Sequence, residues 1–181
     1  MKKENHPFIL LGKDGIEDSS PEKLAYSSSL QYGFGLFETL RIKNGEIIFW
    51  HDHFWRMYNS TKYLGLPFYW NSSQLLEYVK NELIKDYDDG LLRLYLFLSP
   101  LYGYKNINNV ESKMLCSLLL NKLEPVHNAK LYISNVCRYS KDELTRHKLT
   151  QRAHLILVTR QYQQKGAVEG LLLNENFFIT E

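Results

Sequence analysis

Short apolar runs alternate with polar turns in the first part of the chain, which predicts strands joined by tight connections. Residues 8–11, 37–42 and 46–50 are rich in aliphatic and aromatic side chains. The last two runs are separated by a turn that contains Asn44 and Gly45. An Asn-Gly pair between two apolar runs is a strong signal for a β-hairpin.

Apolar side chains recur every three or four residues in three other segments, which predicts helices with one buried face. The first helix is expected at residues 51–64 and ends at Gly65, where a C-cap glycine belongs. The second follows the capping residue Asn71 and continues its apolar face to residue 84. The third is expected at residues 151–164.

The remaining segments complete a pattern of alternating strands and helices. Residues 18–29 are polar and contain Ser-Pro, so they are predicted to form a loop, and residues 99–113 form a long irregular stretch that is either functional or mobile. Further β-rich runs lie at 91–98, 114–120, 130–136, 170–173 and 178–180.

A domain boundary is most plausible at residues 122–128, which contain Pro125. Strands and helices alternate on both sides of it, but the early hairpin predicts mixed sheets. We therefore expect an α+β fold rather than a doubly wound α/β fold. The expected domains are residues 1–122 and 123–181.

Composition and charge narrow the class of protein. The chain has 181 residues with a formal net charge of +2 and two cysteines, Cys116 and Cys137. Two cysteines form no disulfide framework and indicate a reducing compartment, so a cytoplasmic protein is expected. No apolar run approaches the ~20 residues of a membrane span, and a nearly neutral charge without a basic cluster argues against nucleic acid.

The strongest candidate chemistry near the N-terminus is the run Gln-Tyr-Gly-Phe-Gly-Leu-Phe-Glu that ends at Glu38. The expected hairpin follows, and then His53 and Arg56, three residues apart at the start of a helix. Alone, two glycines flanking one residue are a weak signal. The order and spacing resemble the class IV (fold type IV) pyridoxal-phosphate enzymes, which show Tyr-Gly-Asp-Gly-x-Phe-Glu, a hairpin and His-x-x-Arg. The resemblance implies that Arg56, helped by His53, grips the cofactor phosphate.

A second match lies downstream. Lys148 precedes the third helix and a stretch with Gly166, Gly170 and three leucines, and Glu181 follows 33 positions after the lysine. The resemblance implies that Lys148 forms the internal aldimine with pyridoxal 5'-phosphate and that Glu181 contacts the pyridine nitrogen. The chemistry is reasonable, because neighbouring cations promote the unprotonated form that a nucleophilic lysine needs.

Simpler interpretations of these residues stay open. Taken singly, Lys148 reads as a solvated surface group, Glu181 as a frayed carboxylate and Arg56 as a solvent-facing helix residue. A metal site at the His-Asp-His run that ends at His53 lacks an identifiable third ligand, and no metal is expected.

The sequence also departs from the family pattern. Phe34 replaces the aspartate between the two glycines, and Phe177 replaces a glycine before the last expected strand. Residues 98–104 lack the arginine that can hold a substrate carboxylate, so Lys105 is the nearest cation. Family members continue for roughly half as much again after Glu181, so the second domain is expected to be incomplete, in a truncated chain or a shortened relative.

Three hypotheses about function follow. The first is an amino-acid transaminase, in which the candidate substrate-binding residues are Tyr32, Glu38 and Tyr102. The second is an aminodeoxychorismate lyase that releases 4-aminobenzoate and pyruvate. The third, from a different class, is a non-catalytic remnant that folds and dimerises. The family implies two α/β domains with the cofactor in the cleft between them, a homodimer, amino-acid and 2-oxo-acid substrates, and neither nucleic-acid nor membrane partners.

Overall fold

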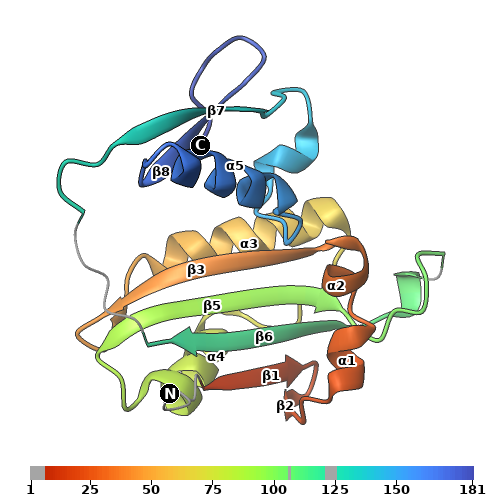
Figure 1. Ribbon diagram of the computed structural model, residues 1–181. Coiled ribbons are helices and arrows are strands. Elements are labelled where there is room, and N and C mark those ends of the chain that lie inside the picture. The colour runs from red at the N-terminus through yellow and green to blue at the C-terminus, as the bar shows by residue number, and fades with distance from the viewer. Residues whose placement is uncertain (1–6, 106, 121–125) are drawn as a thin grey trace. The chain divides into compact units, whose positions relative to one another are not determined.

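The structure, a computed structural model, describes residues 7–105, 107–120 and 126–181. The chain divides into two compact units, Met1–Leu123 and Glu124–Glu181 (Figure 1). The boundary expected between residues 122 and 123 lies outside the described residues.

The first unit is built on a six-stranded sheet in the order β2-β1-β6-β5-β3-β4. Its strands are β1 Phe8–Gly12, β2 Gly15–Glu17, β3 Gly35–Lys43, β4 Glu46–Ile47, β5 Asp89–Leu98 and β6 Ser112–Leu119.

Every paired strand in this sheet is antiparallel, so the expectation of a mixed sheet is wrong for this unit. The reason lies in the connection between β3 and β5. The helices after β4 return the chain to the end at which β3 finished, where Lys43 pairs with Asp89. β5 therefore runs back alongside β3.

The helices of this unit are α1 Pro21–Ala25, α2 Ser28–Tyr32, α3 Trp50–Leu64 and α4 Ser72–Val79. A π-helical turn, η1 Lys80–Ile84, continues α4, and a 3-10 turn, η2 Ile107–Asn109, lies in the long loop before β6.

The loop expected at residues 18–29 is wrong, because two short helices occupy much of it. Ser20 caps α1 by accepting a hydrogen bond from the Lys23 backbone N–H, and Pro21 takes the first helical position. Ser27 caps α2 in the same way. The Ser-Pro pair is thus a helix start, since proline has the φ that a first turn requires.

Several local predictions are confirmed. Asn44 and Gly45 both have positive φ, as a hairpin turn of this type requires. Gly65 ends α3 in the left-handed region at φ 67°. Asn71 and Gln74 form a capping box at the start of α4.

The core of the first unit lies between the sheet and the helices that cover one of its faces (Figure 1). Alternate residues of β3 point into it, namely Leu36, Glu38, Leu40 and Ile42. α3 packs against β3. Glu38 is the exception in this row, because it places a carboxylate where its neighbours place leucine.

The second unit is a strand–helix–strand arrangement. β7 Leu131–Cys137 and β8 Glu169–Leu173 pair in parallel, and α5 Ala153–Gln164 packs on both. A 3-10 turn, η3 Glu143–Arg146, precedes α5. The approach of α5 to β8 is close, because a Cβ built on Gly170 would lie 2.3 Å from Val158 Cγ1.

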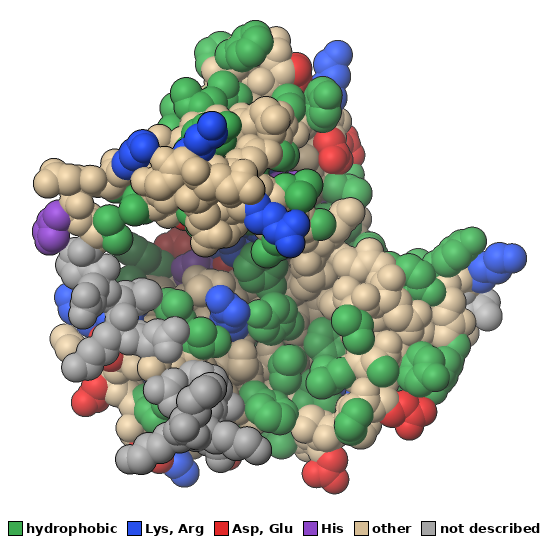
Figure 2. All heavy atoms as spheres, viewed as in Figure 1, with side chains coloured by type: hydrophobic (Ala, Val, Ile, Leu, Met, Phe, Trp, Pro, Cys, Tyr) green, Lys and Arg blue, Asp and Glu red, His purple; other side chains and the backbone are tan. Residues whose placement is uncertain are grey.

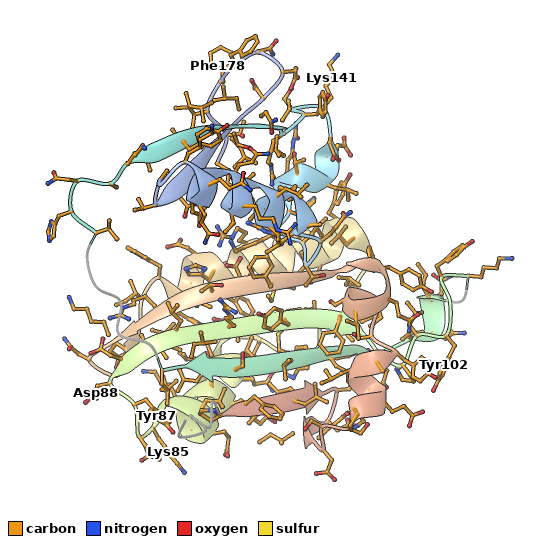
Figure 3. All side chains as sticks on the ribbon, in the orientation of Figure 1. Lys85, Tyr87, Asp88, Tyr102, Lys141 and Phe178 are labelled. Carbon is orange, nitrogen blue, oxygen red and sulfur yellow. The ribbon has the colours of Figure 1, made fainter. Side chains whose placement is uncertain are left out.

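The strand expected at 178–180 is wrong, and the segment makes a single antiparallel bridge between Leu173 and Ile179. A turn at residues 174–178 takes the place of the start of that strand. The Asn174 side chain accepts hydrogen bonds from two later backbone N–H groups, and Phe177 has φ 63°. Phe178 is exposed on this loop (Figure 3), and Figure 2 shows further hydrophobic side chains at the surface of the unit.

Among the residues that the structure describes, no helix is long and apolar enough to cross a membrane.

A cluster of charges holds the edge hairpin of the sheet. Lys113 of β6 is nearly buried and donates to Glu17 of β2 at 2.7 Å and to Glu111 at 3.1 Å, and Lys23 also reaches Glu17 at 3.0 Å. Burial raises the pKa of Glu17, but the hydrogen bonds from Lys113 and Lys23 lower it further, so its pKa lies below the usual value.

We expect Glu17→Gln to lower the free energy of unfolding at pH 7 by about 1 kcal/mol. A carboxyl whose pKa is depressed by folding stabilises the protein above its unfolded pKa, and the effect is lost as the pH falls through the folded pKa. The difference between the two proteins should therefore shrink as the pH falls below the ordinary carboxyl pKa of roughly 4.3, and vanish once the pH lies below the folded pKa. Urea unfolding at several pH values measures it. Glu46→Gln is the control, since its pair with Lys80 is exposed. A difference that does not shrink as the solution becomes more acidic would contradict this account.

Candidate functional site

The first candidate site is centred on the carboxylate of Glu38, which is 1% exposed. Arg56 of α3 donates Nε to Oε1 at 2.6 Å and Nη2 to Oε2 at 2.5 Å. His53 Nδ1 lies 2.7 Å from Oε2. Both oxygens of the buried carboxylate are therefore engaged.

Local structure explains why these three groups meet. His53 and Arg56 are three residues apart and share one face of α3, which packs on the strand that carries Glu38. A buried carboxylate is costly unless it is paired and hydrogen-bonded, and Arg56 provides a two-point contact. The hydrogen bond with Glu38 raises the pKa of Arg56 although burial opposes this, so the guanidinium stays charged.

Arg56 keeps part of its hydrogen-bonding capacity for another group. Its side chain is 50% exposed, and its hydrogen bonds to Glu38 and His53 use Nε and Nη2 but not Nη1 among the described residues. It lines a shallow hollow of about 330 Å³ with Phe49, Asp52 and His53. This hollow lies at the N-terminus of α3, which has no side-chain cap and where the helix dipole favours anions. The arrangement can bind an oxyanion.

The second candidate site lies in the other unit, around Glu181. Oε2 of this side chain accepts from Arg138 Nη1 and Oε1 accepts from Arg152 Nη2, each at 2.8 Å. The backbone is held as well, because Leu172 N donates to Glu181 O at 2.9 Å. Glu181 is thus fixed by two cations rather than frayed.

Lys148 lies in the segment that joins η3 to α5. Its side chain is half-buried and interacts with a neighbouring group. Arg152, four residues further on, holds Glu181. Lys148 and Glu181 are 33 positions apart in the sequence, and they therefore lie on segments that contact one another within this unit.

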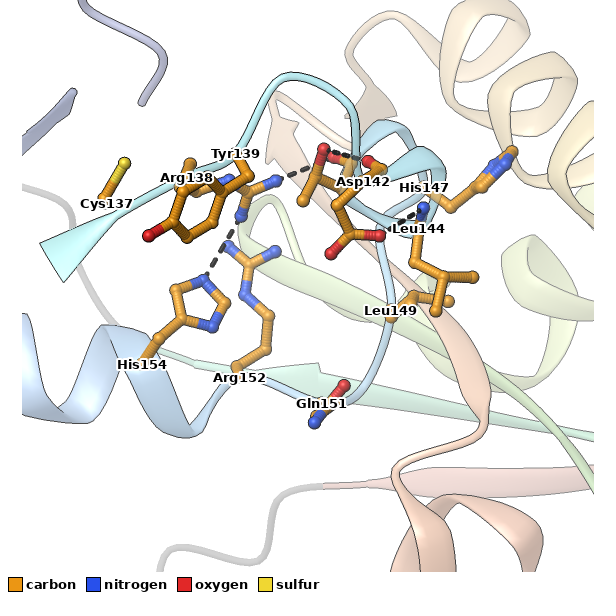
Figure 4. Close-up of a pocket in the computed structure, with 11 residues that line it drawn as sticks. Cys137, Arg138, Tyr139, Asp142, Leu144, His147, Leu149, Gln151, Arg152 and His154 are labelled. Atoms are coloured by element: carbon orange, nitrogen blue, oxygen red, sulfur yellow. Dashed lines mark hydrogen bonds between the residues drawn. The ribbon is translucent and has the colours of Figure 1, made fainter. Parts of the chain in front are cut away.

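A hollow of about 270 Å³ lies beside these residues and is rich in hydrogen-bonding groups (Figure 4). Its lining comprises Cys137, Arg138, Tyr139, Asp142, Leu144, Thr145, His147, Leu149, Gln151, Arg152 and His154. Arg138 donates to the Thr145 carbonyl and to His154 Nε2 in this wall. Burial, together with the nearby Arg138, lowers the pKa of His154, so the imidazole that faces the arginine is neutral at pH 7.

The expected substrate-binding residues occupy different surroundings. Tyr32 and Tyr102 are exposed, and Tyr102 lies on the loop after β5 (Figure 3) with its ring 4.7 Å from that of Tyr26. Glu38 is enclosed by its two partners on α3. Its direct role in the structure is to hold Arg56.

Sequence reasoning missed three residues of these clusters. No motif marks Arg138, Arg152 or His154 as part of a site. The partnership of Glu38 with Arg56 had one available signal, a charged residue in the core-facing row of an alternating strand.

Comparison with known proteins shows the family. The sequence family described as amino-transferase class IV matches residues 35–181, a range that includes Glu38, Arg56, Lys148 and Glu181. The chain belongs to the class IV aminotransferase family. A search of curated proteins found no match.

Solved structures agree with the expected fold. A putative 4-amino-4-deoxychorismate lyase from Legionella pneumophila has 23% identity and a TM-score of 0.79, over 91% of this chain and 60% of that one. The T.th. branched-chain amino acid aminotransferase with pyridoxamine 5'-phosphate has 20% identity and a TM-score of 0.80, over 96% and 61%. The Escherichia coli branched-chain aminotransferase has 19% identity and a TM-score of 0.76, over 97% and 60%.

These matches confirm a fold type IV architecture. The chain spans about 60% of the length of the solved structures that it matches.

We expect the Glu38 cluster to respond unequally to the loss of its two main partners. Arg56→Met leaves the carboxylate buried with His53 alone and should lower the free energy of unfolding by about 3 kcal/mol. Glu38→Gln should cost less, about 1 kcal/mol, because the half-exposed guanidinium can be hydrated. Urea unfolding without added ligand measures both.

Arg41→Met is the matched control, since its partner Asp89 is 53% exposed, and this change should cost less than about 1 kcal/mol. If Arg56→Met proved no more destabilising than this control, the carboxylate would not depend on Arg56.

Proposed function

We propose that the protein is a pyridoxal 5'-phosphate-dependent transaminase of class IV, with Arg56 at the phosphate, Lys148 at the aldehyde carbon and Glu181 at the ring nitrogen. The proposal rests chiefly on Arg56, which belongs to the family match and retains a free donor edge in an anion-favouring hollow. A matched structure carries pyridoxamine 5'-phosphate, which supports the choice of cofactor.

The residues present suit such a cofactor. When bound, pyridoxal phosphate supplies an electron sink for carbanion chemistry at an amino-acid substrate. Because Glu38 already occupies the Nε side of Arg56, the guanidinium would bind the phosphate through Nη1. Glu181 is an acceptor suited to a protonated ring nitrogen, since each oxygen has a further lone pair beside its arginine contact.

Lys148 has two proposed tasks. Its Nζ would hold the cofactor covalently at the aldehyde carbon, whose oxygen leaves as water. Once a substrate amine has displaced it, Nζ would move the α-proton as a general base and acid. Both tasks need an amine that is unprotonated at some stage.

The substrate is proposed from the loop at residues 98–104. It offers no arginine for a carboxylate, and the exposed Tyr102 suits an apolar or aromatic side chain. The same loop supports the second candidate, an aminodeoxychorismate lyase, because a ring-bearing substrate could lie against tyrosine. The Legionella pneumophila structure described as a putative lyase shares the fold, which agrees with this alternative.

A non-catalytic remnant is the alternative from another class, motivated by Phe34 and by the span of the chain relative to its structural matches. Cofactor binding separates it from both enzymes. The homodimeric state and the cytoplasmic location stay predictions of the sequence.

We expect purified full-length protein to bind pyridoxal phosphate and to show a near-visible absorbance band that borohydride removes. Peptide mapping after reduction should place the label on Lys148. Label on Lys141 or Lys165 would reassign the lysine. The absence of a band and of cofactor binding would favour the remnant.

Arg56→Ala should weaken pyridoxal phosphate binding by about 10- to 100-fold, the loss expected for a charge-assisted contact. Binding of pyridoxal, which lacks the phosphate, should change little, and Arg41→Ala should leave both affinities unaltered. Equal weakening of both ligands would show that Arg56 acts on the fold rather than on the phosphate.

The reaction class is tested with single amino acids plus 2-oxoglutarate, and separately with aminodeoxychorismate. We expect oxo-acid formation, fastest from apolar or aromatic donors. Rapid release of 4-aminobenzoate without oxo-acid from any donor would replace the transaminase with the lyase.

A further inference from the structure

Arg138, at the end of β7, joins three separate segments of the second unit. Its Nη1 donates to Glu181 Oε2 at 2.8 Å and to His154 Nε2 at 3.2 Å, and its Nη2 donates to the Thr145 carbonyl at 2.7 Å. The side chain is 17% exposed. Its backbone N–H is bonded to Leu173 O, so the base of the side chain is fixed to β8 as well.

Arg152, immediately before α5, holds the other oxygen of the same carboxylate. Its side chain is 24% exposed. One carboxylate thus binds two arginines, and the imidazole of His154 adds no charge at pH 7 because its pKa is lowered. One guanidinium is enough to neutralise the Glu181 carboxylate, and the second adds a contact that fixes its other oxygen.

The positions of Thr145 and Arg152 along the chain show what these contacts hold in place. Lys148 lies between Thr145, which Arg138 connects to Glu181, and Arg152, which contacts Glu181 directly. The segment that carries Lys148 is therefore attached to the carboxylate on both sides. Displacement of this segment relative to Glu181 would break a charge-assisted hydrogen bond.

We propose that Arg138 and Arg152 are positioning residues that set the place of the Glu181 carboxylate relative to the segment of Lys148. This inference rests on the proposed function, in which Glu181 contacts the ring nitrogen and Lys148 the aldehyde carbon of the same cofactor. Groups that act on one ligand need placement within about 0.5 Å, and a carboxylate on a flexible side chain reaches this only when neighbours hold it.

Two effects of each arginine oppose one another, and this makes the test decisive. The positive charge alone would disfavour a proton on the ring nitrogen, so its removal would favour the protonated ring. Loss of position would weaken the contact of Glu181 with that nitrogen and favour the unprotonated ring. We expect the loss of position to dominate, because a hydrogen bond weakens steeply once its angle is lost.

The experiment uses full-length protein loaded with pyridoxal phosphate that is ¹⁵N-labelled at the ring nitrogen, and the nitrogen chemical shift reports protonation. Glu181→Gln should move the signal toward the unprotonated value. Arg138→Met and Arg152→Met should each move it in the same direction, by roughly half as much. In the Glu181→Gln background, neither change should move it further, as non-additivity requires when one residue acts through another.

Arg160→Met is the control, since Arg160 is an exposed arginine of α5. Circular dichroism verifies that each variant is folded. If Arg138→Met fails to fold, Arg138→Lys replaces it, because lysine keeps the charge but not the three-partner geometry, and it should still shift the signal toward the unprotonated value.

The outcomes are distinct. Signals that match the Arg160→Met control, move toward the protonated value or add to the effect of Glu181→Gln would overturn the positioning role and leave the proposed function standing. If the unaltered protein binds no pyridoxal phosphate, the proposed function fails and the positioning role falls with it.

Discussion

A carboxylate buried in the apolar row of β3 constrains much of the first unit. Glu38 is 1% exposed, so its charge must be met within the protein, and the groups that meet it come from α3. A shift of α3 by one turn would leave this charge unpaired in the core. The ion pair therefore fixes the position of the helix, and the same bond fixes the orientation of the half-exposed Arg56 guanidinium at the surface.

The second unit also holds one carboxylate between two basic side chains, but both of them are arginines. Glu181 is 35% exposed yet binds two arginines, whereas Glu38 is enclosed and binds one arginine and one histidine. Burial explains the first cluster, because an enclosed carboxylate requires compensation. Partial exposure does not require two guanidinium groups, and this contrast is the physical basis for treating the Glu181 cluster as a device for orientation rather than for stability.

Local signals in the sequence were sufficient for most of the fold. The Asn44-Gly45 turn, Gly65 and Asn71 each act through the backbone conformation of one or two residues, so their effects could be predicted without tertiary contacts. The strand expected at 178–180 failed because the Asn174 side chain captures nearby N–H groups, a competition that residue type alone does not reveal.

Only those residues of the candidate site that belong to a sequence motif could be predicted. The spacing of Lys148 and Glu181 placed both residues on segments that do contact one another. Arg138 could not be found, because its partners lie 7, 16 and 43 positions away and come together through the packing of α5 on the strands. The substrate role expected for Glu38 stays a prediction, and the structure adds that its carboxylate is buried in the core-facing row of β3.

The missing side chain of Gly170 has a consequence for genetics as well as for packing. Any substitution would bring a Cβ against Val158, so that either this side chain or α5 must shift, and a shift of α5 has the wider effect. Arg152 precedes that helix and His154 lies in its first turn, so the displacement would reach the carboxylate of Glu181. A saturation-mutagenesis screen for folded protein would therefore find this glycine intolerant of change, although all that it contributes is the space that it leaves empty.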